Sequence, residues 1–164
     1  MKTTLSFLIV LLLVSCKEKE IHKEYTMPQK PEEEKISVSQ LKKELEEKGF
    51  SVFEFIDEKS QDTILMQQYF IAFLKRGENR SQTKEEADSL QMLHMAHLGR
   101  MYEEGFADIS GPFGDNGEMR GITIYNVPTL KIADSLANLD PMVQAGRLAV
   151  EVKPWWAAKG FMLR

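Results

Sequence analysis

The chain is poor in cysteine, with a single one among its 164 residues. A lone thiol forms no internal disulfide, and structural zinc sites usually take several thiolates, so neither crosslink is expected in the fold. An excess of positive charge is also missing, because 21 Lys and Arg residues stand against 25 Asp and Glu, for a formal net charge of −4. Without a basic stripe interleaved with aromatic residues, no nucleic-acid partner is expected.

Only one long apolar run is present, at residues 5–14. It is too short to span a bilayer comfortably but has the length of a signal-peptide core. The run leads into "LVSC", which resembles the lipobox of bacterial lipoproteins, whose cysteine accepts a diacylglyceryl group. We expect residues 1–15 to be a lipoprotein signal peptide and Cys16 to be the lipidation site, with an uncleaved anchor as the alternative. Either way the expected location is the cell envelope, on a membrane facing the periplasm or the cell surface.

Residues 16–35 have mixed charge, two prolines and almost no apolar side chains. Such a segment cannot bury enough surface to offset the entropy of ordering it, so a disordered tether is expected. The remainder, from about residue 36, is long enough for one domain with a core.

Segment 36–65 predicts a helix followed by a β-hairpin. Ser37 and Gln40 have the spacing of a capping box, and Gly49 is a natural stop for the helix. "SVFEFID" then alternates in polarity, and the polar turn "EKSQD" separates it from the apolar strand pattern "TILMQQYFIAFLKRG". We interpret this segment as an extension preceding the main domain.

Residues 66–164 predict an α+β domain in the order strand, helix, strand, strand, helix, strand. Its first helix begins at a second capping box, Thr83 to Glu86, and ends before Gly105. This βαββαβ order is ferredoxin-like, with an antiparallel sheet that carries both helices on one face. The other face needs a cover, either a partner sheet in a homodimer, the N-terminal hairpin, or both.

Three segments together resemble the YCII-related (YciI-like) proteins: "QYFIAFLKRG", "HMAHLGRMYEEGFADISGPFGDNGEMRGITIYNV" and "ADSLANLDPMVQAGRLAVEVKPWW". The resemblance implies a dimeric α+β barrel with a pocket between sheet and helices, and a histidine and an aspartate near that pocket. The histidine directly before Leu98 is His97, and the aspartate of the Asp-Pro motif is Asp140. The lipobox and the N-terminal extension set this chain apart from cytoplasmic members, so no substrate carries over.

Helical periodicity places His94 and His97 on the inward face of the same helix. We expect His97 to be a catalytic base oriented by Asp140, because imidazole titrates near neutral pH; a core-edge histidine bonded to backbone is the alternative. His94 is expected to line the pocket. Other pocket candidates, each with a structural alternative as a turn, solvated or covering residue, are Asp115, Arg120 and Trp155.

No metal or cofactor is expected. Two histidines one turn apart supply two ligands, and the acidic residue of an H-E-x-x-H zinc motif is absent between them. Two functions remain open. One is a small-molecule lyase or isomerase that uses a His–Asp pair on an unknown small molecule, and the other is a non-catalytic ligand-binding or interaction module at the cell envelope.

Overall fold

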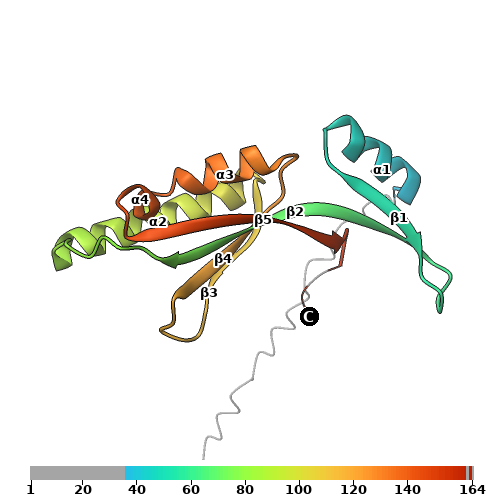
Figure 1. The fold of residues 1–164 in the computed structure, drawn as a ribbon. Coiled ribbons are helices and arrows are strands. Elements are labelled where there is room, and N and C mark those ends of the chain that lie inside the picture. Colours follow the sequence, from blue (N-terminus) through green and yellow to red (C-terminus); the bar gives the residue numbers. More distant parts are fainter. Residues whose placement is uncertain (1–35, 162, 164) are drawn as a thin grey trace, which may run out of the picture. The chain divides into compact units, whose positions relative to one another are not determined.

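The computed structural model describes residues 36–161 and 163. The expected signal peptide (1–15), the lipidation site Cys16 and the tether (16–35) lie outside the described residues. Within the described part, no helix has both the length and the apolar composition needed to cross a membrane. The elements, shown in Figure 1, are α1 (Val38–Glu47), β1 (Val52–Ile56), β2 (Thr63–Arg76), α2 (Lys84–Glu103), β3 (Ala107–Pro112), β4 (Met119–Tyr125), α3 (Leu130–Asn138), α4 (Pro141–Gln144) and β5 (Leu148–Ala158).

The strands form one antiparallel sheet with β2 at its centre. β5 pairs along one edge of β2, while β4 and β1 share the other edge, β4 beside its C-terminal half and β1 beside its N-terminal half. β3 pairs with the outer edge of β4. The order β5-β2-β4-β3, with α2 and α3 on one face, confirms the predicted α+β, ferredoxin-like fold (Figure 1).

Strand β2 changes its buried face half-way along. Buried side chains fall at Leu65, Gln67 and Tyr69, and then at Phe70, Ala72 and Leu74. The pairing with β5 runs without a bulge through this point, so the two sets lie on opposite faces of the sheet. The extension and the main domain therefore share one continuous strand, which crosses the expected boundary between residues 65 and 66.

Each half of β2 is covered by different helices. In the C-terminal half, Phe70 and Ala72 belong to the buried core that includes Met101 of α2 and Ala133 of α3. In the N-terminal half, Lys42 of α1 pairs with a β1 carboxylate, Glu54, that stands directly opposite Leu65. Helix α1 thus lies on the face of the sheet that carries Leu65. Helices α2 and α3 lie on the opposite face, over the C-terminal half of β2.

The predicted helix start at Thr83 is confirmed in both of its hydrogen bonds. The Thr83 hydroxyl accepts from the backbone N–H of Glu86, and the Glu86 carboxylate accepts from the N–H of Thr83. At α1 only half of the predicted capping box forms. Ser37 accepts from the N–H of Gln40, but the Gln40 side chain donates forward to Glu44.

The segment between α3 and β5 contains an element that the sequence patterns did not predict. Asp140 is not simply the end of α3, because it caps the short helix α4, in which Pro141 occupies the first turn. A proline there loses no intrahelical hydrogen bond, since its missing N–H would be unpaired anyway. This turn brings Asp140 into the interior, where only 2% of its surface remains exposed.

Candidate functional site

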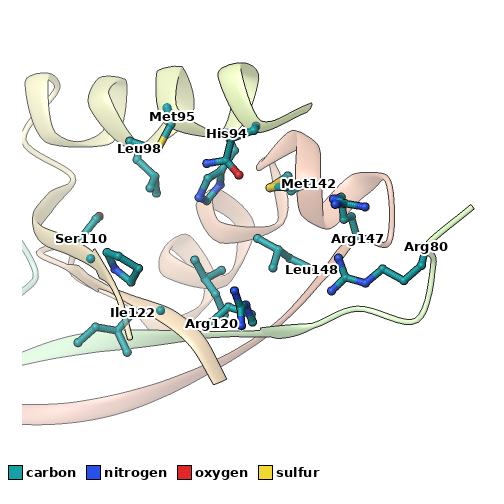
Figure 2. Close-up of a pocket in the computed structure, with 15 residues that line it drawn as sticks. Arg80, His94, Met95, Leu98, Ser110, Arg120, Ile122, Met142, Arg147 and Leu148 are labelled. Carbon is teal, nitrogen blue, oxygen red and sulfur yellow. The ribbon is translucent and has the colours of Figure 1, made fainter. Parts of the chain in front are cut away.

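A cavity of about 390 Å³ lies beneath α2, between that helix and the sheet (Figure 2). Its wall on the helix side includes His94, Met95 and Leu98, and its floor includes residues of β2, β3 and β4. The α4–β5 connection closes one end with Met142, Arg147 and Leu148. This volume is within the range of small-molecule sites, about 300–1,000 Å³.

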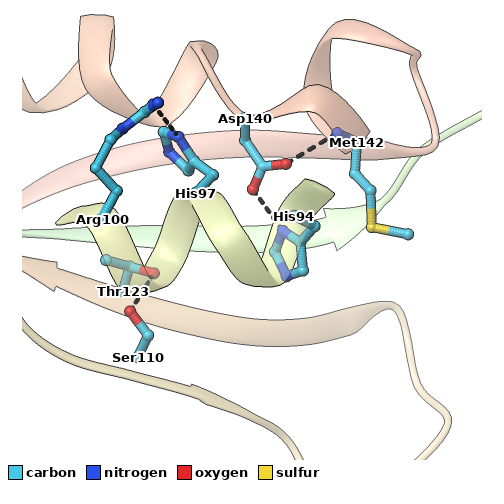
Figure 3. Close-up of polar contacts among 7 residues, drawn as sticks. All are labelled: His94, His97, Arg100, Ser110, Thr123, Asp140 and Met142. Atoms are coloured by element: carbon cyan, nitrogen blue, oxygen red, sulfur yellow. Dashed lines mark hydrogen bonds and ion pairs between the residues drawn. The ribbon is translucent and has the colours of Figure 1, made fainter. Parts of the chain in front are cut away.

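His94 and Asp140 form a buried polar pair at the wall of this cavity (Figure 3). The His94 Nδ1 and Asp140 Oδ2 atoms lie 2.6 Å apart. The other carboxylate oxygen, Oδ1, accepts from the backbone N–H of Met142 at 2.8 Å, which is the cap of α4. An ionised carboxylate only accepts, so Nδ1 of His94 carries a hydrogen, and in the neutral form of the ring Nε2 carries the lone pair.

The expected partner of Asp140 was His97, and this prediction is wrong: the carboxylate binds His94, one turn earlier. Both histidines lie on the buried face of α2, so periodicity alone could not separate them. What separates them is position along the helix axis. Met142 and the rest of α4 pack beside the part of α2 that carries His94.

His97 is buried with 3% of its surface exposed, and it does not line the cavity. Its Nδ1 accepts from Nη2 of Arg100 at 3.1 Å (Figure 3). Its Nε2 makes no hydrogen bond of good geometry among the described residues, although the polar backbone of Leu136 lies near the ring. Burial lowers the pKa of His97; the charge of Asp140 opposes this effect and the charge of Arg100 adds to it. His97 is therefore placed as a neutral interior histidine.

Of the three remaining pocket candidates, one lines the cavity and two do not. Arg120 lines the cavity, and its Nη1 donates to the Gly117 carbonyl at 3.3 Å. Asp115 does not line it; its carboxylate accepts from the N–H of Gly117 within the β3–β4 turn. Trp155 also lies outside the cavity, 42% exposed and packed against the ring of Tyr69.

Two charged residues of the lining, Arg80 and Arg147, were not predicted from the sequence. Arg80 follows the end of β2 and Arg147 precedes β5, so they are far apart in the chain and belong to no local pattern. As for metals, the described residues contain no group of three or more His, Cys, Asp or Glu side chains placed to hold an ion.

Residues 69–156, more than half of the chain, match the YCII-related domain. The chain belongs to this family. The match begins within β2 and ends within β5, so the YCII-related domain contains His94, Asp140 and all three arginines of the cavity. The resemblance inferred from the sequence is thereby confirmed, and α1 and β1 lie before the matched region.

No curated protein sequence matches this YCII-related chain. Among solved structures, a 5-chloro-2-hydroxyhydroquinone dehydrochlorinase from Burkholderia phenoliruptrix AC1100, in complex with 2,5-dihydroxybenzoquinone, is similar at 21% identity and a TM-score of 0.41. The similarity covers 53% of this chain and 92% of that one. Similarity at this level carries no inference about chemistry.

We expect the buried His97 to make stability depend on pH. Because its pKa is lowered in the fold, the unfolded chain binds a proton near pH 6.5 that the folded ring does not. The contribution of His97 to the free energy of unfolding is therefore fully present above this pH. It is lost as the pH falls through this value, by at most about 1.4 kcal/mol per pH unit. Urea unfolding at several pH values should show a shallower decline in His97→Gln than in the unsubstituted protein. Identical slopes would contradict the assignment of a neutral, buried His97.

Proposed function

We propose that this YCII-related domain is a small-molecule enzyme of the lyase or isomerase type, in which His94 transfers a proton and Asp140 orients it. The observation that carries the proposal is the buried hydrogen bond from His94 Nδ1 to Asp140 at the wall of a cavity of small-molecule size. The catalytic base is therefore His94, in place of His97, which was expected from the sequence.

The geometry supports general base catalysis by the free ring nitrogen. With Nδ1 donating to Asp140, Nε2 of His94 carries the lone pair that accepts a proton from a substrate in the cavity. The imidazolium formed in that step is stabilised by the adjacent carboxylate, which has itself been fixed by the Met142 N–H. The same nitrogen then returns the proton to another atom of the substrate, or to the leaving group.

Substitution of either member of the pair should slow proton transfer strongly. We expect His94→Gln and Asp140→Asn to lower the rate roughly 10²–10⁴-fold, because the base is lost in one and its orienting charge in the other. The assay is deuterium incorporation from D₂O, followed by NMR, across a panel of small enolisable ketones, esters and carboxylic acids. His97→Gln is the matched control, one helical turn away and outside the cavity.

Two outcomes would count against catalysis by this pair. Exchange at the normal rate in His94→Gln would place the base elsewhere. Binding of panel compounds with no exchange in the unsubstituted protein would favour the alternative, a non-catalytic ligand-binding module.

We also propose that the domain is a homodimer, as the family resemblance implies. Ile71 and Phe73 of β2 stand beside Ile124 and Ile122 of β4, on the face opposite Phe70 and Ala72. These four side chains form an apolar stripe, which is flanked on β5 by Lys153 opposite Ile71 and by Glu151 opposite Phe73. Helices α2 and α3 cover only the other face, so a second copy of the sheet is a suitable cover for the stripe.

Sedimentation of residues 36–164 tests the homodimer. We expect the mass of two chains, and we expect Phe73→Glu to give a monomer because it places a charge in the apolar interface. Met92→Glu, at a residue 69% exposed on α2, is the control that should leave the dimer intact. A monomer for the unsubstituted protein would contradict the proposal.

We further propose that the protein is exported and anchored by lipid at Cys16. Expression of the full chain in a bacterial host with a clickable fatty acid should label the protein and place it in the membrane fraction. Cys16→Ser should lose the label, since the acceptor thiol is gone. An unlabelled, membrane-free wild-type protein would refute the lipid anchor.

A further inference from the structure

We propose that Arg80, Arg120 and Arg147 form an oxyanion-binding site in the cavity beside His94, and that the ligand is a small organic anion with a carboxylate or phosphate group. The inference names the substrate class of the proposed enzyme and so rests on the proposed function. The side chains of the three arginines are drawn with His94 in Figure 2.

The charge of the cavity is opposite to that of the protein. Its fifteen lining residues include three arginines and no aspartate or glutamate, in a chain with a formal net charge of −4. The Asp140 carboxylate is not part of the lining, and both of its oxygens are used, by His94 and by the Met142 N–H. The positive charge of the cavity is therefore not neutralised from within its own wall.

Arg147 has an unused donor. Its Nη1 donates to the side-chain oxygen of Gln82 at 3.2 Å, whereas its Nε is buried without a hydrogen-bond partner among the described residues. A buried donor left without an acceptor costs about 1–3 kcal/mol. Arg147 also lines the cavity, so its guanidinium is placed to contact a ligand oxygen there.

Arg80 lies among like charges. None of the three cavity arginines forms an ion pair with another described residue. Arg80 is exposed to solvent; slight desolvation of its guanidinium lowers its pKa, and the nearby charges of Arg147, Arg76 and Arg120 lower it further, while Glu118 acts in the opposite direction. Repulsion among these guanidinium groups would be relieved by a bound anion.

The backbone holds Arg80 and Arg147 together. The N–H of Gly77 donates to the Arg147 carbonyl, and the N–H of Asn79 donates to the Gly146 carbonyl. A Cβ atom on Gly77 would stand 2.2 Å from the Gly146 carbonyl oxygen, so this close approach requires glycine. The segment that carries Arg80 is thereby attached to the one that carries Arg147.

A break in the sheet register explains why the side chain of Arg120 reaches the cavity. Leu74 pairs with Gly121 and Lys75 pairs with Met119, which leaves Arg120 as the extra residue of a β-bulge. Bulges redirect side chains, and they are common beside functional sites. Arg120 reaches the cavity from β4, while the other two arginines reach it from the end near α4 and β5.

The chemistry of guanidinium selects the ligand. Its planar fork of N–H donors matches the oxygens of a carboxylate or phosphate, and such charge-assisted hydrogen bonds are roughly twice as strong as neutral ones. An anion held here would place the rest of a small substrate in the same cavity as His94. The guanidinium groups would also stabilise negative charge that develops when His94 removes a proton.

The test is a direct binding measurement by calorimetry at low ionic strength, with benzoate, benzamide and inorganic phosphate as probes. Benzamide matches benzoate in shape but has no charge. We expect benzoate to bind at least roughly tenfold more tightly than benzamide, and Arg147→Gln and Arg80→Gln to weaken benzoate roughly tenfold or more. Tighter binding of phosphate than of benzoate would identify a phosphorylated ligand, and the reverse order a carboxylate.

Matched controls separate this inference from the proposed function. Arg100→Gln removes the same charge from a residue outside the cavity and should leave benzoate affinity unchanged. His94→Gln should keep benzoate binding while it loses proton exchange. Arg147→Lys, which keeps the charge but not the fork, should bind with intermediate affinity and guards against a folding defect in Arg147→Gln.

Three results would overturn the oxyanion site: equal affinity for benzoate and benzamide, no binding of either anion at millimolar concentration, or unchanged affinity in both Arg→Gln variants. Anion binding that depends on Arg80 and Arg147, in a protein whose His94→Gln variant exchanges protons normally, would refute the proposed base and leave the oxyanion site standing.

Discussion

The hydrogen bond between His94 and Asp140 is the interaction on which the site depends. It joins the middle of α2 to the N-cap residue of α4, and the same carboxylate caps α4 by accepting from the Met142 N–H. Both side chains are buried, so loss of either one would leave its partner without a hydrogen bond in the interior, at a cost of about 1–3 kcal/mol or more for a charged group. The pair therefore fixes the wall of the cavity and the orientation of the imidazole together.

The cavity combines two environments that rarely coincide on a mildly acidic protein. Beside α2 it has apolar walls, with Met95 and Leu98, and it contains an imidazole whose tautomer is set by Asp140. The same cavity is lined by arginines from three separate segments of the chain. A proton-transfer group and anion-binding groups in one cavity are an arrangement suited to small acidic substrates.

Much of the fold could be predicted from local patterns. The capping box at Thr83 and the glycine stop at Gly105 reproduce the bounds of α2 closely, and Gly105 adopts the positive φ of 75° that favours glycine. The family resemblance added the prediction that Asp140 belongs to the site. It also led to His97 in place of His94, because two residues one turn apart on the same helix face have the same periodicity. Helix α4 escaped prediction because an Asp-Pro pair serves equally as the end of one helix and as the start of another.

The sequence by itself determined the ferredoxin-like order of elements, because capping, alternation and turn residues act between neighbours in the chain. Only the tertiary structure decided which histidine meets Asp140, since that depends on where α4 packs along α2. It also decided that Arg80, Arg120 and Arg147 share one cavity. Their convergence follows from the close approach at Gly77 and the bulge at Arg120, which depend on contacts between segments distant in the chain.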